Sequence, residues 1–330
     1  DLDSIFDKRN KREILRSPGN KVQAFTDRGQ YWDAWNIDPE YEQKQLSDTK
    51  LRSIEWRENN ELRQVIRVVK QFNSSELIQD YILEKQANLL TIKNTVDWQE
   101  THVMIKVAFP LNLTSDYVTY EIPCSTIKRT TKPETAAEKA QWEVSALNWA
   151  DLTDTKADYG VSLLNNCKYG YDAQPDQLRL TLLRAATWPD PQSDRGIHHF
   201  TYSIYPHQHS WQEANTVHQG YELNTNLHTV ILPQPEQKKQ NSQQLPTRSE
   251  LLNLSADNLI LMALQLSNHQ NLTMRCYEAW GTEAKIELRS DVNLELAHQI
   301  DCLERKQVEN EQLQRVKPHK NKKKKNIEIN

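Results

Sequence analysis

Residues 31–38 read YWDAWNID and place two tryptophans and two aspartates within eight positions. An indole face can pack on the apolar face of a pyranose ring, while a carboxylate accepts hydrogen bonds from the sugar's hydroxyl groups. Trp32, Asp33 and Trp35 are therefore candidates for a sugar subsite. The alternative is an ordinary strand in which alternating tryptophans are buried in the core.

A second candidate segment, Trp188–Gly196, reads WPDPQSDRG and predicts a rigid, proline-rich loop. Rigid loops at the end of a β-scaffold often carry binding groups. Arg184, which precedes the loop, and Asp190, Asp194 and Arg195 within it can hydrogen-bond sugar hydroxyls. A salt bridge between an arginine and an aspartate that fixes the loop explains the same residues equally well.

The third candidate is a histidine cluster, in which His207 and His209 form a His-x-His pair. Residues i and i+2 of a strand share a face, so both imidazoles could bind one zinc ion. A catalytic zinc also needs a third ligand and an open position. The alternative is a polar loop after a strand that ends at Pro206, and the pair alone is a weak signal. The other histidines of the cluster are His198, His199 and His218.

Alternation of apolar and polar residues with period two predicts the strands that position these loops. Many strands with short connections, and no alternation of strands with helices, predict an antiparallel sandwich. The clearest alternation predicts strands over residues 102–109, 177–184 and 200–205. Further strands are predicted over residues 64–70, 77–84, 89–98, 118–122, 141–147, 259–266, 272–277 and 284–288. Short helical character is found only over 135–140 and 294–302. The residues expected in the core are Val103, Ile105, Val107, Leu178, Leu180, Leu182, Phe200, Tyr202 and Ile204.

A polar segment divides the chain. Residues 234–249 read QPEQKKQNSQQLPTRS, in which Leu245 is the single apolar residue apart from two prolines. This composition predicts a linker or a long exposed loop. We therefore expect a large sandwich over residues 1–233 and a small β-domain over residues 250–330.

Composition excludes several classes of partner and site. With 41 basic and 45 acidic residues, the net charge of −4 gives no electrostatic reason to expect nucleic acid or an anionic membrane. No apolar run approaches the roughly 20 residues of a membrane-spanning helix. The chain starts at Asp1 and its first methionine is Met104, so we expect a fragment or a processed product. The widely spaced cysteines predict buried free thiols in a reducing compartment, and they are Cys124, Cys167, Cys276 and Cys302.

Several segments together resemble the C-terminal β-rich region of cytoplasmic-type α-mannosidases of glycoside hydrolase family 38. They follow the family's order and cover nearly the whole chain. This sequence has Asn36 where the family usually has aspartate, which puts in doubt any role there that needs a negative charge. The matching segments are 3–12 (around SIFDKRNKRE), 19–38, 142–170 (with WEVSALNWADL and YGVSLLNNCKYG), 181–207 (TLLRAATWPDPQSDRGIHHFTYSIYPH), 277–281 (YEAWG) and 300–304 (IDCLE).

The resemblance implies an all-β fold, a galactose-mutarotase-like antiparallel supersandwich followed by a smaller β-sandwich domain truncated at its last strand. It implies a parent enzyme that hydrolyses terminal α-linked mannose from oligosaccharides with retention, in the cytoplasm. Zinc or another divalent metal, its ligands and the catalytic residues would belong to an N-terminal barrel outside this chain. The chain alone would then hold no metal and be inactive, and its partners would be that barrel and the α-mannoside. The residues expected next to the substrate are Trp32, Asp33, Trp35, Arg184, Asp190, Asp194 and Arg195.

Two functions of other classes stay open. One is a self-standing carbohydrate-binding sandwich. The other is a mutarotase-like epimerase that uses a histidine acid and a glutamate base within the sandwich. The epimerase would need no preceding domain, and the isolated chain would accelerate the interconversion of sugar anomers.

Overall fold

The computed structural model describes residues 1–29, 32–231, 246–266, 272–291, 296–308, 315–316 and 325–329. The chain forms two compact units. One comprises Asp1–Pro123 and Ile127–Asn224, and the other comprises Cys124–Thr126 and Thr225–Asn330. The predicted linker, 234–249, lies outside the described residues except for its last four positions.

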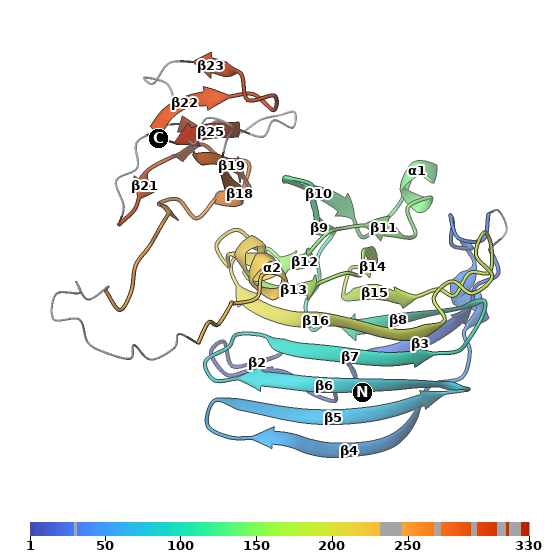
Figure 1. The fold of residues 1–330 in the computed structure, drawn as a ribbon. Coiled ribbons are helices and arrows are strands. Elements are labelled where there is room, and N and C mark those ends of the chain that lie inside the picture. Colours follow the sequence, from blue (N-terminus) through green and yellow to red (C-terminus); the bar gives the residue numbers. More distant parts are fainter. Residues whose placement is uncertain are drawn as a thin grey trace. The chain divides into compact units, whose positions relative to one another are not determined.

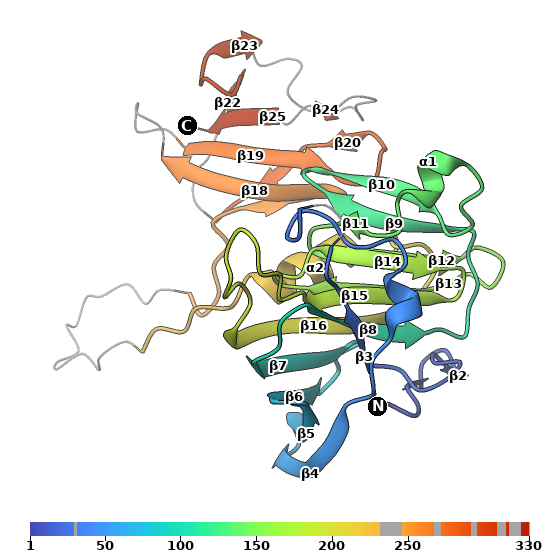
Figure 2. The ribbon, with the colours of Figure 1, turned by 90° about the vertical axis from the view of Figure 1, so that its right-hand side faces the viewer.

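The first unit is a sandwich of two antiparallel sheets (Figure 1). Within the described residues, the larger sheet has nine strands in the order β10 (Ser125–Thr130), β9 (Tyr117–Ile122), β12 (Trp149–Asp154), β13 (Tyr159–Asn165), β16 (Gly196–Gln208), β7 (Leu90–Trp98), β6 (Ser75–Glu84), β5 (Arg63–Phe72) and β4 (Lys50–Asn59). The smaller sheet has five, in the order β11 (Val144–Ser145), β14 (Gly170–Gln174), β15 (Gln177–Leu183), β8 (Val103–Pro110) and β3 (Lys21–Thr26). Figure 2 shows β14, β15, β8 and β3 side by side. A short pair, β1 (Phe6–Asp7) and β2 (Arg12–Glu13), precedes them.

The core lies between the two sheets and confirms the alternation read from the sequence. Strands from both sheets send one set of side chains inward, as period-two geometry requires. All nine residues predicted to be buried belong to one continuous hydrophobic core, namely Val103, Ile105, Val107, Leu178, Leu180, Leu182, Phe200, Tyr202 and Ile204.

Strand β8 is buried on both faces, which alternation alone did not predict. Its second face carries Met104, which packs in a small separate core with Phe25 and Tyr41. The same face carries Lys106, which is fully buried. A single turn of 3-10 helix, η1 (Tyr41–Lys44), therefore covers the outer face of the smaller sheet.

Two predictions about strands were wrong in detail. Residues 141–147 form only the two-residue strand β11. Pro206 does not end its strand, because β16 continues to Gln208 with Pro206 opposite Val161 on β13. Proline donates no hydrogen bond, but it is accommodated where its missing N–H is not required.

The helical predictions divide in the same way. A short helix, α1 (Ala136–Lys139), forms within 135–140, and Thr135 and Glu138 close its N-terminus with a reciprocal capping box. Residues 294–302 were wrongly given helical character, since they contain strand β22 (Leu296–Ile300). A second helix, α2 (Thr216–Asn224), was missed because its sequence is mostly polar and lacks a clear apolar stripe.

The second unit is also β-structure. One sheet contains, in order, β18 (Leu259–Leu266), β19 (Leu272–Glu278), β25 (Lys325–Ile329), β22 and β23 (Lys306–Val308). Two short pairs join β17 (Asn253–Leu254) to β21 (Leu288–Arg289) and β20 (Ala284–Lys285) to β24 (Arg315–Val316). Strands predicted at 259–266 and 272–277 are confirmed, whereas 284–288 divides between β20 and β21. The small hydrophobic core of the second unit contains Leu259, Met274, Cys276, Ala284 and Ile286.

The cysteines are thiols, as predicted, but only one is buried. Cys276 lies in the core of the second unit, whereas Cys167 and Cys302 are exposed and Cys124 is partly exposed. The prediction of four buried thiols was therefore wrong for three of them. In the described part of the chain, no helix has the length and apolar character needed to cross a membrane.

Candidate functional site

Three tryptophans lie together on the surface of the first unit. Trp32, Trp35 and Trp188 are 68%, 69% and 48% exposed. The ring of Trp188 lies 5.2 Å from that of Trp32 and 5.5 Å from that of Trp35, measured between centroids. Residues 32–35 form a turn rather than a strand, so the interpretation as alternating buried tryptophans is wrong. Tyr31 lies outside the described residues. We call Trp32, Trp35 and Trp188 the tryptophan cluster.

Arg184 holds the loop that carries two of these tryptophans. Its Nε donates to Asp27 Oδ2 at 2.6 Å, in a salt bridge with a fully buried carboxylate. Its Nη2 donates to the carbonyl oxygens of Asp33, at 3.1 Å, and Asn36, at 2.8 Å. A planar guanidinium can reach several acceptors at once in this way. Arg184 therefore fixes the backbone of the loop, and Asn36 contributes its carbonyl group while its side chain is exposed.

The carboxylates of Asp33 and Asp194 join the two loops to the scaffold. Asp33 Oδ2 accepts hydrogen bonds from Thr187 N at 2.7 Å and Thr187 Oγ1 at 3.3 Å. Asp194 Oδ2 accepts from the backbone N–H groups of Arg184, at 3.3 Å, and Ala185, at 3.1 Å. Ala185 has a φ of 54°, a conformation that L-residues seldom adopt without support from their surroundings. Both aspartates thus stabilise the shape of the site.

The remaining predicted residues lie on the exposed loop. Asp190 Oδ1 accepts from Gln192 N at 2.9 Å and closes a turn, and Arg195 is exposed. A hollow of about 290 Å³ beside the loop is lined by Ala34, Arg184 and Asp194, among others. The structure thus brings the seven residues into two adjoining loops, in which Arg184, Asp33, Asp190 and Asp194 act as supports. Their contact with a sugar stays a prediction.

The His-x-His pair is not arranged to share a metal. His207 is buried and its Nε2 lies 2.8 Å from Asp151 Oδ2, while Ser162 Oγ donates to the same oxygen at 2.8 Å. His209 lies beyond the end of β16 with a φ of 65°, and its Nδ1 pairs with Asp158 Oδ2 at 2.7 Å. The change of backbone direction separates the two imidazoles. The described residues contain no group of three or more histidine, cysteine, aspartate or glutamate side chains that could hold a metal ion, so they do not fit a zinc site.

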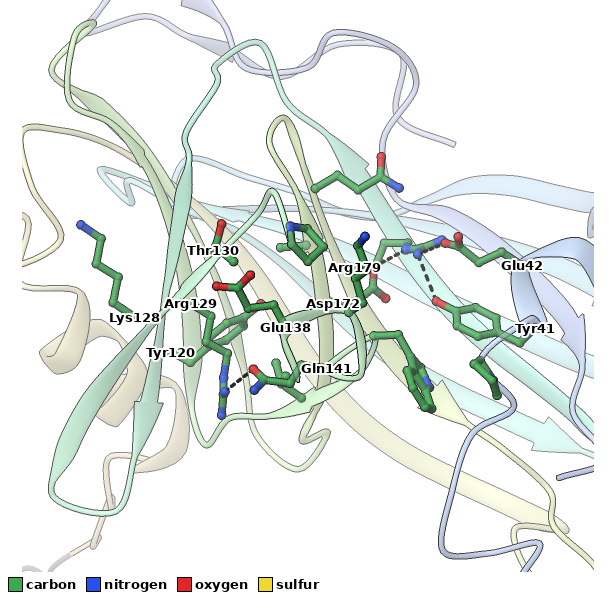
Figure 3. Close-up of a pocket in the computed structure, with 17 residues that line it drawn as sticks. Tyr41, Glu42, Tyr120, Lys128, Arg129, Thr130, Glu138, Gln141, Asp172 and Arg179 are labelled. Atoms are coloured by element: carbon green, nitrogen blue, oxygen red, sulfur yellow. Dashed lines mark hydrogen bonds and ion pairs between the residues drawn. The ribbon is translucent and has the colours of Figure 1, made fainter. Parts of the chain in front are cut away.

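A pocket that sequence reasoning missed lies on the outer face of the smaller sheet (Figure 3). It has a volume of about 450 Å³ and is lined from η1, β9, β10, α1, β14 and β15. At its floor, Arg179 Nε donates to Asp172 Oδ1 at 2.6 Å and Nη2 donates to the hydroxyl of Tyr41 at 3.0 Å. Arg179 also pairs with Glu42, and these side chains point toward one another in Figure 3.

Lys106 extends this arrangement beneath the pocket. Its fully buried ammonium group forms ion pairs with Glu143 and with Asp172, the latter at 2.5 Å. We call Lys106, Arg179, Glu143 and Asp172 the buried charge cluster, and the exposed Glu42 pairs with it from η1. Its sequence signal was a lysine or arginine inside an apolar strand, as in VMIKVAFP and QLRLTLL. That signal becomes specific only once both faces of the strands are known to be covered.

Burial and pairing oppose each other in setting the charges of these groups. Burial alone would lower the pKa of Lys106, but the carboxylates of Asp172 and Glu143 outweigh this and raise it. The pKa of Arg179 is raised in the same way, chiefly by Asp172. Both side chains therefore stay cationic at neutral pH. By contrast, burial raises the pKa of Glu121, on β9, to about 7.

Comparison with known proteins agrees with this architecture. The family model described as glycosyl hydrolases family 38 C-terminal domain matches residues 1–192, and the model described as glycosyl hydrolases family 38 C-terminal beta sandwich domain matches residues 258–330. Alpha-mannosidase 2C1 of Mus musculus is 32% identical over 294 residues, which cover 87% of this chain and 27% of that protein. Alpha-mannosidase G of Dictyostelium discoideum is 35% identical over 242 residues, which cover 70% of this chain and 22% of that protein.

A solved structure shows the same fold. The crystal structure of an alpha-mannosidase from Enterococcus faecalis V583 superposes with a TM-score of 0.79 at 14% identity, and covers 98% of this chain and 40% of that one. The chain spans about a quarter of the length of the curated relatives it matches. It belongs to glycoside hydrolase family 38 and matches the C-terminal β-rich domains of that family.

Proposed function

We propose that this chain forms part of an α-mannosidase that hydrolyses terminal α-linked mannose from oligosaccharides in the cytoplasm. The observation that carries the proposal is the match of two C-terminal family models, in order, over residues 1–192 and 258–330. The curated relatives are α-mannosidases, and this chain aligns with only 27% of the mouse protein. The catalytic groups would then belong to an N-terminal barrel in the remainder of the protein.

In this proposal the tryptophan cluster forms one wall of the substrate site. The indole rings of Trp32 and Trp35 each lie within 5.5 Å of the ring of Trp188, and together the three offer an apolar surface on which a pyranose can stack. Arg184 and Asp33 hold the loop in place before substrate arrives, so little conformational entropy is lost on binding. The chain's own contribution is therefore to bind and orient the sugar.

The chemistry itself would come from outside this chain. A retaining glycosidase needs two carboxyl groups on either side of the scissile bond. A zinc or other divalent ion, bound by residues of the barrel, would help to hold the hydroxyl groups of the terminal mannose. Residues 1–330 would accordingly bind a mannoside weakly, near a Kd of about 1 mM, and would not cleave it.

The test compares two proteins in an assay with an activated aryl α-mannoside. One is residues 1–330, and the other is a longer protein that includes the polypeptide preceding Asp1. We expect turnover only from the longer protein, and loss of that turnover in a chelator. Turnover by residues 1–330 that a chelator abolishes would place the catalytic site in this chain and contradict the proposal.

A matched pair of variants tests the role of the tryptophan cluster in the longer protein. Trp35→Ala removes one ring of the stacking surface and should raise KM by about 5- to 150-fold, since stacking of this kind contributes on the order of 1–3 kcal/mol. Trp35→Phe keeps an aromatic face and should restore most of the affinity. Equal KM values for both variants and the unmodified protein would remove the cluster from the substrate site.

A further inference from the structure

Strand β4 is exposed along its whole length. It is the edge strand of the nine-stranded sheet, and all ten of its residues are exposed, in contrast to its neighbour β5. Figure 1 shows β4 at the end of the sheet next to β5, with β6 on the other side of β5. Exposed edge strands are usually short, charged or covered, because they offer unpaired backbone groups to other chains.

The register between β4 and β5 shows which face of β4 points toward the core. Ile54 lies opposite Val68, and Trp56 lies opposite Ile66. Directly opposite residues share a face of the sheet, and Val68 belongs to the hydrophobic core between the sheets. Ile54 and Trp56 therefore lie on the inner face of β4. Leu51, which lies opposite the buried Lys70, is on the same face.

These three side chains have the composition of a core without being covered. Leu51, Ile54 and Trp56 are 58%, 62% and 58% exposed. The outward positions between them are polar, with Ser53 opposite Val69 and Glu55 opposite Arg67. A strand that faced water on both sides would have no reason to be apolar on one of them. Contiguous exposed apolar side chains of this kind mark an interaction surface.

The start of the chain lies beside this surface. Asp1 Oδ1 forms an ion pair with Lys70 Nζ at 3.1 Å, and Lys70 is the residue opposite Leu51. Leu2 is held by backbone hydrogen bonds with Gly19 in both directions, at 2.8 Å, so the position of the first residues is fixed. Any polypeptide that precedes Asp1 therefore emerges beside Lys70, whose neighbour across the strand pair is Leu51 on the inner face of β4.

We propose that the inner face of β4 is covered, in the full-length protein, by the polypeptide that precedes Asp1. This inference rests on the proposed function, which places a larger part of the protein ahead of this chain. The match to relatives of which the chain covers 27% or less provides the necessary length. The covering segment is apolar where it meets Ile54 and Trp56, and it continues the core beyond the edge of the smaller sheet.

Cysteine labelling distinguishes a covered face from a free one. Ile54→Cys places a thiol on the inner face, and Glu55→Cys places one on the adjacent outward position as the matched control. In residues 1–330 both thiols should react with a maleimide at similar rates. In the longer protein, Ile54→Cys should react at least about tenfold more slowly, while Glu55→Cys is unchanged. Peptide mapping by mass spectrometry separates these sites from Cys124, Cys167 and Cys302.

Two results would overturn the proposal. Equal reactivity of both thiols in the longer protein would show that the inner face is not covered there. Protection of Ile54→Cys in residues 1–330 that grows with protein concentration would show that a second copy covers it instead. Trp56→Cys provides a second inner-face position if the first variant does not fold. Labelling needs no turnover, so the two proposals can fail separately. An active longer protein with an unprotected inner face would contradict this inference alone. A longer protein with a protected inner face and no activity would contradict only the proposed function.

Discussion

Arg179 and Arg184 lie five positions apart and both hold the segment 33–42, but they do so in different ways. Arg184 binds one buried carboxylate and the backbone carbonyl groups of Asp33, Ala34 and Asn36, in the loop that carries Trp32 and Trp35. Arg179 binds two carboxylates and a tyrosine hydroxyl, within a cluster that also contains Lys106. Removing either arginine would take a cation away from a buried carboxylate, Asp27 in one case and Asp172 in the other. The other acceptors of Arg184 are backbone carbonyl groups, which would lose only hydrogen bonds, whereas Asp172 also belongs to the ion pair with the buried Lys106. Arg184 therefore shapes a loop, whereas Arg179 belongs to a charge cluster on which the fold depends.

The largest effect is expected from removing the cation at the centre of the cluster. Lys106→Met would leave Glu143 and Asp172 without the ammonium group that they share, and should reduce the free energy of unfolding by about 3–5 kcal/mol. Urea denaturation measures this loss. Lys128→Met, on the exposed rim of the pocket, is the control and should change stability by less than about 0.5 kcal/mol. Similar losses in both variants would contradict the special role of the cluster.

Glu121 is a buried carboxylate that lies outside the buried charge cluster and has no cation beside it in the described part of the chain. Glu121 accepts a hydrogen bond from Asn148 N at 2.7 Å, and among the described residues no lysine or arginine pairs with it. Its pKa is raised by burial from 4.5 to about 7, so the folded protein keeps a proton that the unfolded chain releases between these values. Stability is therefore lost as the pH rises from about 4.5 to 7 and stays lower above that range.

Replacing this glutamate removes the penalty. Glu121→Gln should be more stable than the unmodified protein at pH 8, by up to about 3 kcal/mol, with the difference vanishing near pH 4.5. Denaturation curves for both proteins across this range provide the measurement. A difference that does not depend on pH would show that ionisation of Glu121 is not its cause.

A smaller and more local effect is expected at Arg184. Arg184→Lys keeps the charge but cannot reach Asp27 and the loop carbonyls together, and should reduce stability by about 1–3 kcal/mol. Hydrogen exchange should increase in residues 32–37 and stay unchanged in β5 and β6. Faster exchange throughout the sandwich would mean that Arg184, like Lys106, supports the whole fold.

The smallest effect on stability is expected within the tryptophan cluster. Trp35 is exposed, so Trp35→Ala should change the free energy of unfolding by less than about 0.5 kcal/mol. Trp98→Ala, in the core, is the contrasting variant and should cost about 3–5 kcal/mol. Thermal unfolding of the two variants measures how much each tryptophan contributes to stability, and so distinguishes an exposed residue available for binding from a core residue that packs. A large loss in Trp35→Ala would place this residue with the core.

The sequence predicted what depends on local periodicity. Alternation at Val103, Ile105 and Val107 specified a strand and its core-facing side, because that pattern follows from backbone geometry alone. The short helical character predicted over residues 135–140 was likewise local, and a short helix closed by a capping box of Thr135 and Glu138 forms there. The YWDAWNID composition led to a candidate site whose two tryptophans are exposed on one loop.

What the sequence did not predict depends on residues far apart along the chain. The partners of Lys106 come from Glu143 and Asp172, and no spacing rule links these positions. One of the two readings of the proline-rich loop was a salt bridge between an arginine and an aspartate that fixes it, but the carboxylate partner of Arg184 is Asp27, 157 positions earlier. The shared strand face that a zinc site at His207 and His209 would need is absent, because His209 lies beyond the end of β16 with a positive φ.

Arg184 contacts the backbone of the loop that carries Trp32 and Trp35, and this affects which substitutions the surface can accept. Its contacts to Asp33, Ala34 and Asn36 are all made to backbone oxygens, which every amino acid provides. Substitutions at Ala34, Trp35 and Asn36 can therefore alter the chemistry of the surface and leave the grip intact. The backbone of the loop therefore stays fixed while its side chains can be exchanged, by evolution or in a randomised library at these three positions.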